Sequence, residues 1–242
     1  MATEVKICGL SRREDIDACL AAGADLVGFV FFDKSPRALA LDVAAALAAP
    51  VRGRLGVVAL TVNATDDVVA AIAADLAPDF LQLHGSESPE RVAEIAAKFG
   101  LRTIKALPVG GAEDLRAAAS YAKVADRLLL DARPPRQATR PGGNGEPFDW
   151  ELLAGFEPGL PWFLSGGLSP DNVGEALRRT GAPGLDVSSG VESAPGVKDA
   201  GRIAAFLAAA RAADKTLGRK AGEPGDSAAP DPGPAPRGFA AA

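Results

Sequence analysis

The stretch Val5-Lys6-Ile7-Cys8-Gly9, close to the N-terminus, predicts a short β-strand that ends at a glycine. Side chains alternate along a strand, so we expect Lys6 and Cys8 on one face and Val5 and Ile7 on the other. A free cysteine is usually a small buried hydrophobic residue, which this stretch alone favours for Cys8. A lysine beside a thiol also favours the thiolate, so the same pair is a candidate nucleophile or base.

A strand followed by a helix is a pattern that recurs along the chain. After the first strand, Ser11-Arg12-Arg13-Glu14 predicts a helix start, and Ser88-Pro89-Glu90 and Ser169-Pro170-Asp171 add a capping residue with proline in the first turn. Short apolar runs predict strands at 4–8, 26–31, 55–61, 80–83, 103–105, 127–131, 162–165 and 185–187. Alanine-rich stretches predict helices at 13–22, 41–48, 65–74, 89–99, 112–122, 150–155, 170–179 and about 199–211.

This alternation predicts an α/β fold with a parallel sheet, because parallel neighbours need a crossover connection. Eight repeats favour a closed (β/α)8 TIM barrel over a doubly wound open sheet. The open sheet usually carries a Gly-x-Gly-x-x-Gly turn after its first strand, and Cys8-Gly9-Leu10-Ser11 does not match it. We therefore expect one barrel domain over residues 1–213. Residues 214–242 are rich in proline, glycine and alanine, which predicts a disordered tail.

Composition excludes several classes of function. The net charge of −5 argues against a nucleic-acid surface, and no apolar run is long enough for a membrane span. The N-terminus lacks the layout of a signal peptide, so we expect a cytoplasmic protein. Two cysteines are too few for a disulfide framework, and a single histidine, His84, cannot build a His-rich metal site. We expect neither a metal nor a cofactor.

Polar residues stand where predicted strands end, which is where a (β/α)8 barrel carries its functional groups. Asp131 closes Leu128-Leu129-Leu130 as a catalytic carboxyl, a helix cap or a salt-bridged rim group. The loop at 132–148 contains Gly142-Gly143-Asn144-Gly145 and predicts either a mobile lid or a merely flexible connection. In the strand that ends at residue 83, alternation directs Gln82 and His84 inward. His84 is a candidate for substrate contact, with a satisfied structural histidine as the alternative.

The last two strands are followed by glycine-containing turns, Ser165-Gly166-Gly167-Leu168 and Ser188-Ser189-Gly190-Val191. Loops after these two strands often form the phosphate site of such a barrel, and glycines let an oxyanion approach the main chain. After the second strand, Arg37 is a candidate for bidentate pairing with a carboxylate, or else a solvated surface charge.

Taken together, these motifs closely resemble the phosphoribosylanthranilate isomerase family of tryptophan biosynthesis. The resemblance spans roughly residues 4 to 211. The motifs that carry it are Lys6-Ile7-Cys8-Gly9, Gly28-Phe29-Val30-Phe31 with Lys34-Ser35-Pro36-Arg37, Gln82-Leu83-His84-Gly85, Gly142-Gly143-Asn144-Gly145 with Phe148-Asp149-Trp150, Ser165-Gly166-Gly167-Leu168 with Asn172-Val173, and Asp186-Val187-Ser188-Ser189-Gly190-Val191-Glu192.

The resemblance implies a metal-free Amadori rearrangement of N-(5-phosphoribosyl)anthranilate to 1-(2-carboxyphenylamino)-1-deoxyribulose 5-phosphate. It implies that Cys8 is the base that removes the C2 proton and that Asp131 is the acid that opens the sugar ring. It implies substrate-binding residues at Lys6, Arg37, Gln82, His84, Gly166, Gly167, Asp186, Ser188, Ser189 and Gly190, where Asp186 either orders this region or touches the substrate. The partner is then a small phosphosugar, and the protein is a monomer or homodimer. A thiol ordinarily titrates near 8.5, so Lys6 is a candidate for lowering the pKa of Cys8.

The chain departs from the family pattern in the loop after Asp131, where residues 134–141 are extra and Glu146 replaces the usual lysine or polar residue. These changes bear on loop motion and affinity, not on reaction type. Two other functions stay open: another phosphosugar-binding barrel isomerase, and a non-catalytic phosphosugar-binding protein. A metal-dependent epimerase would need several inward histidines, and a non-catalytic protein would be expected to lose Cys8 or Asp131.

Overall fold

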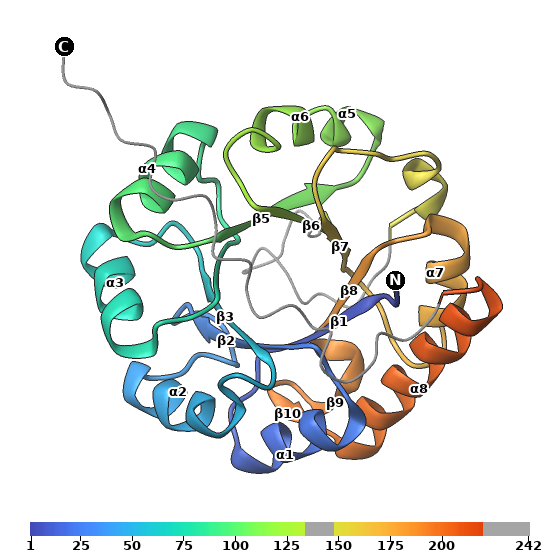
Figure 1. Cartoon of the computed structure of the whole chain (residues 1–242), viewed down its shortest axis with the longest axis horizontal. Coiled ribbons are helices and arrows are strands. Elements are labelled where there is room, and N and C mark those ends of the chain that lie inside the picture. The colour runs from blue at the N-terminus through green and yellow to red at the C-terminus, as the bar shows by residue number, and fades with distance from the viewer. Residues whose placement is uncertain (134–147, 220–242) are drawn as a thin grey trace.

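The computed structural model describes residues 1–133 and 148–219. The glycine-containing part of the loop after Asp131, the departures within it, and residues 220–242 of the proposed tail lie outside the described residues. Eight parallel strands form a closed barrel in chain order, and helices surround it (Figure 1). The prediction of a (β/α)8 barrel is confirmed.

The barrel strands begin within one residue of their predicted starts, and most of them also end where predicted. They are β1 (Glu4–Cys8), β2 (Leu26–Phe31), β3 (Gly56–Thr61), β4 (Phe80–Leu83), β5 (Thr103–Val109), β6 (Arg127–Ala132), β7 (Trp162–Leu164) and β8 (Gly184–Val187). Strand β5 is longer than the predicted 103–105 and runs through Pro108. Proline is tolerated there because it lies near the end of the strand and is exposed.

The helices differ more from their predictions. They are α1 (Arg13–Ala22), α2 (Leu41–Ala48), the 3-10 turn η1 (Ala49–Val51), α3 (Asp66–Ala71), the π-turn η2 (Ile72–Leu76), α4 (Pro89–Phe99), α5 (Ala112–Leu115), α6 (Ala118–Tyr121), the 3-10 turns η3 (Trp150–Leu153) and η4 (Ser189–Val191), α7 (Val173–Thr180) and α8 (Ala200–Thr216). The predicted helix at 112–122 is two short helices, and the one at 150–155 is only a 3-10 turn.

Helix α8 runs to Thr216 instead of ending near residue 211 because tertiary contacts stabilise its last turn. Asp214 is buried and accepts hydrogen bonds from the backbone N–H of Thr3 at 2.9 Å and from its hydroxyl at 2.6 Å. Arg219 donates to the same hydroxyl at 2.7 Å and to the carbonyl of Ala182 at 2.9 Å. Residues 214–219, assigned to the tail on composition, therefore contact the barrel.

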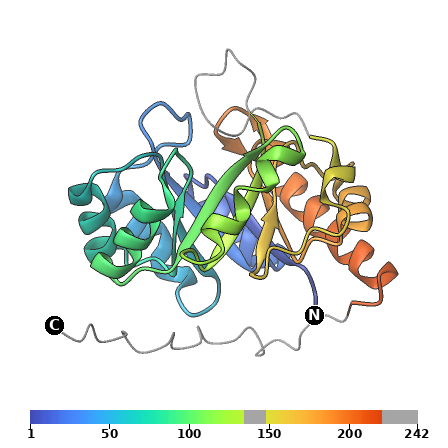
Figure 2. The same cartoon turned by 90° about the horizontal axis from the view of Figure 1, so that it is seen from above.

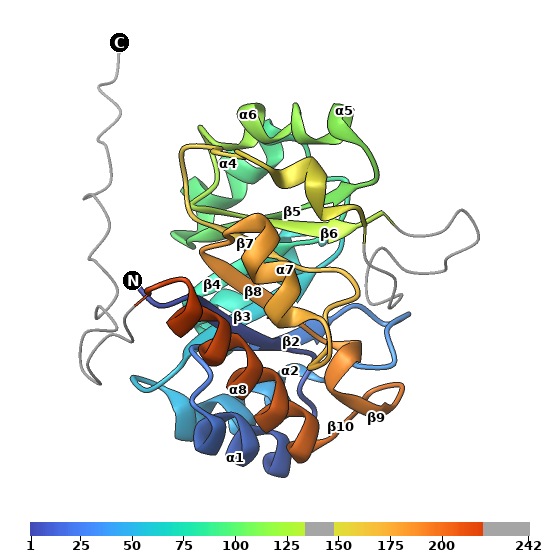
Figure 3. The ribbon, with the colours of Figure 1, turned by 90° about the vertical axis from the view of Figure 1, so that its right-hand side faces the viewer.

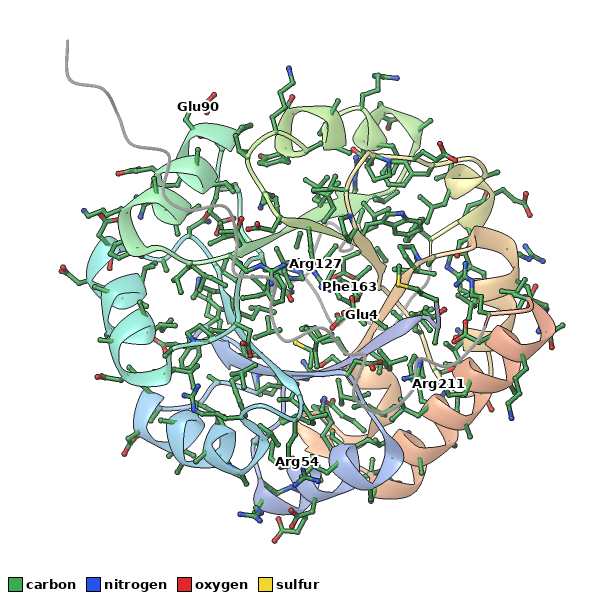
Figure 4. The ribbon with its side chains drawn as sticks, in the orientation of Figure 1. Glu4, Arg54, Glu90, Arg127, Phe163 and Arg211 are labelled. Atoms are coloured by element: carbon green, nitrogen blue, oxygen red, sulfur yellow. The ribbon has the colours of Figure 1, made fainter. Side chains whose placement is uncertain are left out.

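Alternation along the strands separates two apolar layers. Val5 and Ile7 belong to the large cluster between strands and helices, whereas Leu26, Phe80 and Phe163 pack inside the barrel. The N-terminal end of the barrel is closed by Arg127, which pairs with Glu4 and lies 4.6 Å from the ring centroid of Phe80 (Figure 4). The open end is therefore the one where the strands finish.

A small antiparallel hairpin that the sequence did not predict follows β8 and η4. It consists of β9 (Glu192–Ala194) and β10 (Val197–Lys198), joined through a turn with Gly196 at φ 81°. The hairpin lies at the end of the barrel opposite the N-terminus, as the side views show (Figures 2 and 3). It thus borders the open end of the barrel.

Candidate active site

A pocket lies at the carboxyl ends of the strands. All of the predicted site residues line it except Lys6 and Gly190. The polar lining consists of Cys8, Ser35, Arg37, Gln82, His84, Asp131, Ser165, Asp186, Ser188 and Ser189, with the glycines Gly166 and Gly167. Apolar side chains such as Val30, Phe32 and Leu60 complete the wall. The fold therefore gathers strand ends from both halves of the sequence into one concave site.

Lys6 lies beneath the pocket floor and is fully buried. Strands β1 and β8 pair with Lys6 opposite Asp186, and the ammonium lies 2.6 Å from the Asp186 carboxylate. The Ser165 hydroxyl donates to the other carboxylate oxygen of Asp186 at 3.0 Å. Asp186 thus holds Lys6 and Ser165 in place, the ordering role that the sequence left open alongside substrate contact.

Cys8 stands at the end of β1, above Lys6 and on the same face of the strand, as alternation predicted. Burial raises the pKa of the Cys8 thiol above its ordinary value, more than the Lys6 ammonium lowers it, and Asp186 adds to the rise. Burial is the largest influence on Lys6 and lowers its pKa, but attraction and hydrogen bonds to Asp186 and Cys8 together outweigh burial and raise the pKa of Lys6. Lys6 therefore favours the thiolate without producing it, and the unliganded pocket holds Cys8 as a thiol.

Room for the Cys8 side chain comes from Gly28, its register partner on β2. A Cβ at Gly28 would lie 2.9 Å from the Cys8 sulfur and 3.2 Å from Cε of Lys6. Glycine at this position lets both side chains pass over the strand.

Asp131 is the last residue but one of β6, which runs one residue further than predicted, and its carboxyl faces the pocket beside His84. His84 Nε2 lies 3.2 Å from Oδ2 of Asp131, while the Ala132 N–H donates to Oδ1 at 2.9 Å. The amide nitrogen of Gln82 lies 2.9 Å from Nδ1 of His84. With Gln82 donating to Nδ1, the ring proton is on Nε2 and points at Asp131. Gln82 is fully buried, so its contact is with His84.

Buried charges behind β4 set the path of the chain after His84. Lys105 donates to the carbonyls of Leu83 at 3.1 Å and Gly85 at 2.7 Å, and pairs with Glu87 at 2.9 Å. Glu87 in turn accepts from the Gly85 N–H at 3.0 Å. Burial lowers the pKa of Lys105, although Glu87 opposes that shift. This network holds the turn from which His84 reaches the pocket.

Arg37 is buried, so the interpretation of a solvated surface charge is wrong. Its Nε and Nη2 atoms donate to the two carboxylate oxygens of Glu192, each at 2.7 Å. Glu192 also accepts from Lys198 at 2.6 Å. Sequence reasoning missed Glu192, Lys198 and Ser165 as site residues. Glu192 and Ser165 stand inside quoted motifs, whereas Lys198 carried no signal because its position depends on the hairpin.

The two glycine-containing turns lie side by side at the pocket edge. Gly166 and Gly167 have φ values of 85° and 67°, the left-handed region that favours glycine. Gly190 does not line the pocket; instead, a Cβ there would lie 1.8 Å from the carbonyl oxygen of Leu168. The glycine therefore allows the turn after β8 to pack against the turn after β7.

The described part of the chain lacks two further features. Residues 1–133 and 148–219 contain no group of three or more His, Cys, Asp or Glu side chains that could hold a metal ion. None of the helices described there combines the length and apolar character needed to cross a membrane.

Fold and pocket together define a TIM-barrel protein whose site combines a thiol, a carboxyl group and turns suited to an anionic ligand. A family model described as N-(5'-phosphoribosyl)anthranilate (PRA) isomerase matches residues 5–209. The chain belongs to this family.

Curated relatives and solved structures agree with this membership. The N-(5'-phosphoribosyl)anthranilate isomerase of Rhodopseudomonas palustris strain BisA53 is 59% identical over 215 residues, which cover 89% of this chain and 99% of the relative. The enzyme of strain HaA2 is 55% identical over 217 residues, which cover 90% of this chain and 100% of the relative. The Thermotoga maritima enzyme structure is 34% identical with a TM-score of 0.79, covering 87% of this chain and 99% of that chain. A PRA isomerase bound to reduced 1-(o-carboxyphenylamino)-1-deoxyribulose 5-phosphate is 32% identical with a TM-score of 0.76 and the same coverage.

Proposed function

We propose that the protein isomerises N-(5-phosphoribosyl)anthranilate to 1-(2-carboxyphenylamino)-1-deoxyribulose 5-phosphate in tryptophan biosynthesis. The observation that carries the proposal is that the Cys8 thiol and the Asp131 carboxyl line one pocket. The curated relatives, at 55% and 59% identity over nearly their whole length, carry the same activity in their names. All catalytic groups in the proposal are side chains.

In the first step, Asp131 donates a proton to the furanose ring oxygen, the ring C–O bond breaks, and a Schiff base forms. An aspartic acid can do this only if it carries the proton that it donates. His84 lies within hydrogen-bond distance of the same carboxyl group, so the two share a proton site. Gln82 orients His84 through Nδ1, and this is the part we assign to it instead of direct substrate contact.

In the second step, the Cys8 thiolate removes the proton from C2 and leaves an enolamine, which tautomerises to the ketone product. Burial makes this thiolate scarce, but it also makes it a stronger base, because the raised pKa favours the thiol that results from proton abstraction. Lys6 keeps a positive charge beneath the sulfur throughout. Its part in the proposal is electrostatic, since it is buried away from the ligand.

The substrate has two anionic ends, and the pocket has two places for them. Arg37 is placed for the anthranilate carboxylate, because a guanidinium can hold a carboxylate oxygen with fixed geometry. The turns at Gly166-Gly167 and Ser188-Ser189-Gly190 are placed for the phosphate, as is usual after the last two strands of a TIM barrel. Asp186 supports this end of the pocket through Ser165 and Lys6.

The direct test mixes the protein with freshly made phosphoribosylanthranilate and follows fluorescence, since anthranilate derivatives fluoresce. We expect fluorescence to fall with time in proportion to protein concentration. Tight binding of the substrate without any loss of fluorescence would support a non-catalytic phosphosugar-binding protein instead. Assaying the related substrate of histidine biosynthesis in parallel distinguishes a second barrel isomerase activity.

We also propose that the protein is cytoplasmic and is a monomer or a homodimer. Both cysteines are free and buried, which is usual in a reducing compartment. A structure that is 32% identical with a TM-score of 0.75 is described as mutually generated monomers of the dimeric Thermotoga maritima enzyme. Light scattering after size-exclusion chromatography gives the mass of the particle and decides between one and two chains.

A further inference from the structure

The β9–β10 hairpin places two buried charged residues directly behind the pocket wall. Glu192 is 6% exposed and accepts hydrogen bonds from Arg37 at both carboxylate oxygens. Because Nε and Nη2 of Arg37 both donate to Glu192, the guanidinium plane is held in one orientation. Its third nitrogen, Nη1, makes no hydrogen bond within the described residues, and Arg37 lines the pocket.

Lys198 links the same carboxylate to the other end of the pocket. Its ammonium donates to Glu192 at 2.6 Å, to the Ser188 carbonyl at 3.0 Å and to the Ser188 hydroxyl oxygen at 3.3 Å. An ammonium group has three donors, and all three therefore meet acceptors. Because the Ser188 oxygen accepts from Lys198, its own hydrogen is free to point into the pocket, which Ser188 lines.

The cluster of Arg37, Glu192 and Lys198 has two cations and one carboxylate, so one positive charge is left over in a buried place. Burial opposes the charge of Glu192, but hydrogen bonds from Arg37 and attraction to Lys198 outweigh it and lower the pKa of Glu192. Glu192 is thus an ionised bridge between two cations. A surplus positive charge next to the pocket favours an anionic ligand.

We propose that Glu192 and Lys198 are positioning residues that prepare both anion subsites before the substrate arrives. Glu192 aims Arg37 at the carboxylate of the ligand, and Lys198 aims the Ser188 hydroxyl at the phosphate. The inference rests on the proposed function, because that function supplies a ligand with both anionic groups. Neither residue lines the pocket, so each acts through the side chain that it holds.

Preorganisation of this kind lowers the cost of ordering side chains on binding. Neither Glu192 nor Lys198 bonds to the reacting groups Cys8 and Asp131, and the Lys198 charge ranks behind burial, Lys6 and Asp186 among the causes that shift the pKa of Cys8. Loss of Glu192 or Lys198 should therefore raise KM far more than it lowers kcat, which is the signature of lost binding shared by ground state and transition state.

The experiment compares Glu192→Gln and Lys198→Met with the control Asp214→Asn. Glu192→Gln and Asp214→Asn each turn a buried carboxylate into an amide. Asp214 lies at the closed end of the barrel, hydrogen-bonded to Thr3, so its replacement controls for the loss of a buried charge away from the pocket. The probes are KM and kcat for phosphoribosylanthranilate, and calorimetric Kd values for reduced 1-(o-carboxyphenylamino)-1-deoxyribulose 5-phosphate and for inorganic phosphate.

We expect Glu192→Gln to raise KM and the Kd of the reduced analogue about tenfold, with kcat changed less than about threefold. Lys198→Met should raise the Kd for inorganic phosphate about tenfold, because the Ser188 hydroxyl is then no longer held by the ammonium group. Asp214→Asn should lower the unfolding temperature and leave KM and both Kd values unchanged.

Unchanged KM and Kd values in Glu192→Gln and Lys198→Met would overturn the inference, as would equal effects in Asp214→Asn. Glu192→Gln leaves two buried cations against a neutral amide, so the double variant Glu192→Gln/Lys198→Met, with one cation fewer, replaces it should the single variant fail to fold. A wild-type protein that neither binds phosphate nor converts the substrate contradicts the proposed function itself. If the wild-type protein binds phosphate and converts the substrate, and the variants bind as tightly as the wild type, only the positioning roles of Glu192 and Lys198 are contradicted.

Discussion

Cys8 and Asp131 divide the proposed chemistry between two side chains that end strands on the same rim. Burial favours the protonated state of Cys8, and Lys6 supplies the opposing attraction. Asp131 instead has His84 as its neighbour, with Nε2 of the ring 3.2 Å from Oδ2 of the carboxyl group. Each residue therefore has its own polar partner at the pocket.

Replacing either residue should remove turnover and keep the fold. We expect Cys8→Ser and Asp131→Asn each to lower kcat by about a hundredfold or more, because general acid–base groups contribute roughly 10²–10⁴-fold. The changes are nearly isosteric, so circular dichroism and unfolding temperature should stay close to the wild type. Near-normal kcat in either variant would contradict the assigned role.

The raised pKa of the Cys8 thiol makes a second prediction at this scale. Only the thiolate is alkylated, so iodoacetamide should modify native Cys8 more slowly near pH 8 than it modifies a peptide thiol. The labelling rate should keep rising above pH 9.0, beyond the ordinary thiol range of about 8.5 to 9.0 in which a peptide thiol levels off. Mass spectrometry of the labelled peptide measures it, and labelling at the peptide rate near pH 7 would show that the shift is absent.

The same shift has a consequence for stability. Above pH 9.0 the unfolded chain releases the Cys8 proton before the folded protein does. The free energy of unfolding therefore falls as the pH rises, and the protein becomes less stable. Cys19 acts in the same direction, because burial raises its pKa to about 12.

Among the elements, β1 and β2 show how a strand pair shapes the site. Gly28→Ala should push the Cys8 sulfur and the Lys6 stem aside, since the new Cβ would lie 2.9 Å from the sulfur. We expect kcat/KM to fall at least about tenfold, because displacements near 1 Å can cost about a hundredfold in rate. The control is Gly174→Ala in α7, whose Cβ would have its nearest neighbour at 3.5 Å. Wild-type kinetics in Gly28→Ala would show that the strand accommodates the methyl group.

The helices that differed from prediction show the limits of local pattern. Alanine-rich composition at 112–122 predicted one helix, but the chain breaks it into α5 and α6. The hairpin β9–β10 is too short to give a periodic signal, and its charged residues read as surface groups until the fold turns them inward.

Across the whole molecule, the two ends of the barrel have separate tasks. The open end carries the pocket, and the closed end joins the last helix to the first strand through Asp214, Thr3 and Arg219. Composition put the domain boundary at residue 213, on the near side of these contacts.

Two truncations test where the folded unit ends. A chain that stops at Ala213 loses Asp214 and Arg219, and we expect its free energy of unfolding to fall by about 2–4 kcal/mol relative to a chain that stops at Arg219. Urea unfolding of both chains measures the difference. Equal stabilities would support the boundary inferred from composition.

The sequence by itself determined the barrel and the order of its strands. It also determined the shared face of Lys6 and Cys8 and the inward direction of Gln82 and His84, because strand alternation is a local property with a period of two. It did not determine which charges meet. Arg37 and Glu192 are separated by 155 positions, and Lys6 and Asp186 by 180, so barrel closure alone makes these pairs. Tertiary structure likewise decided the protonation of Cys8, because the balance between burial and the Lys6 charge exists only once both are packed inside the barrel.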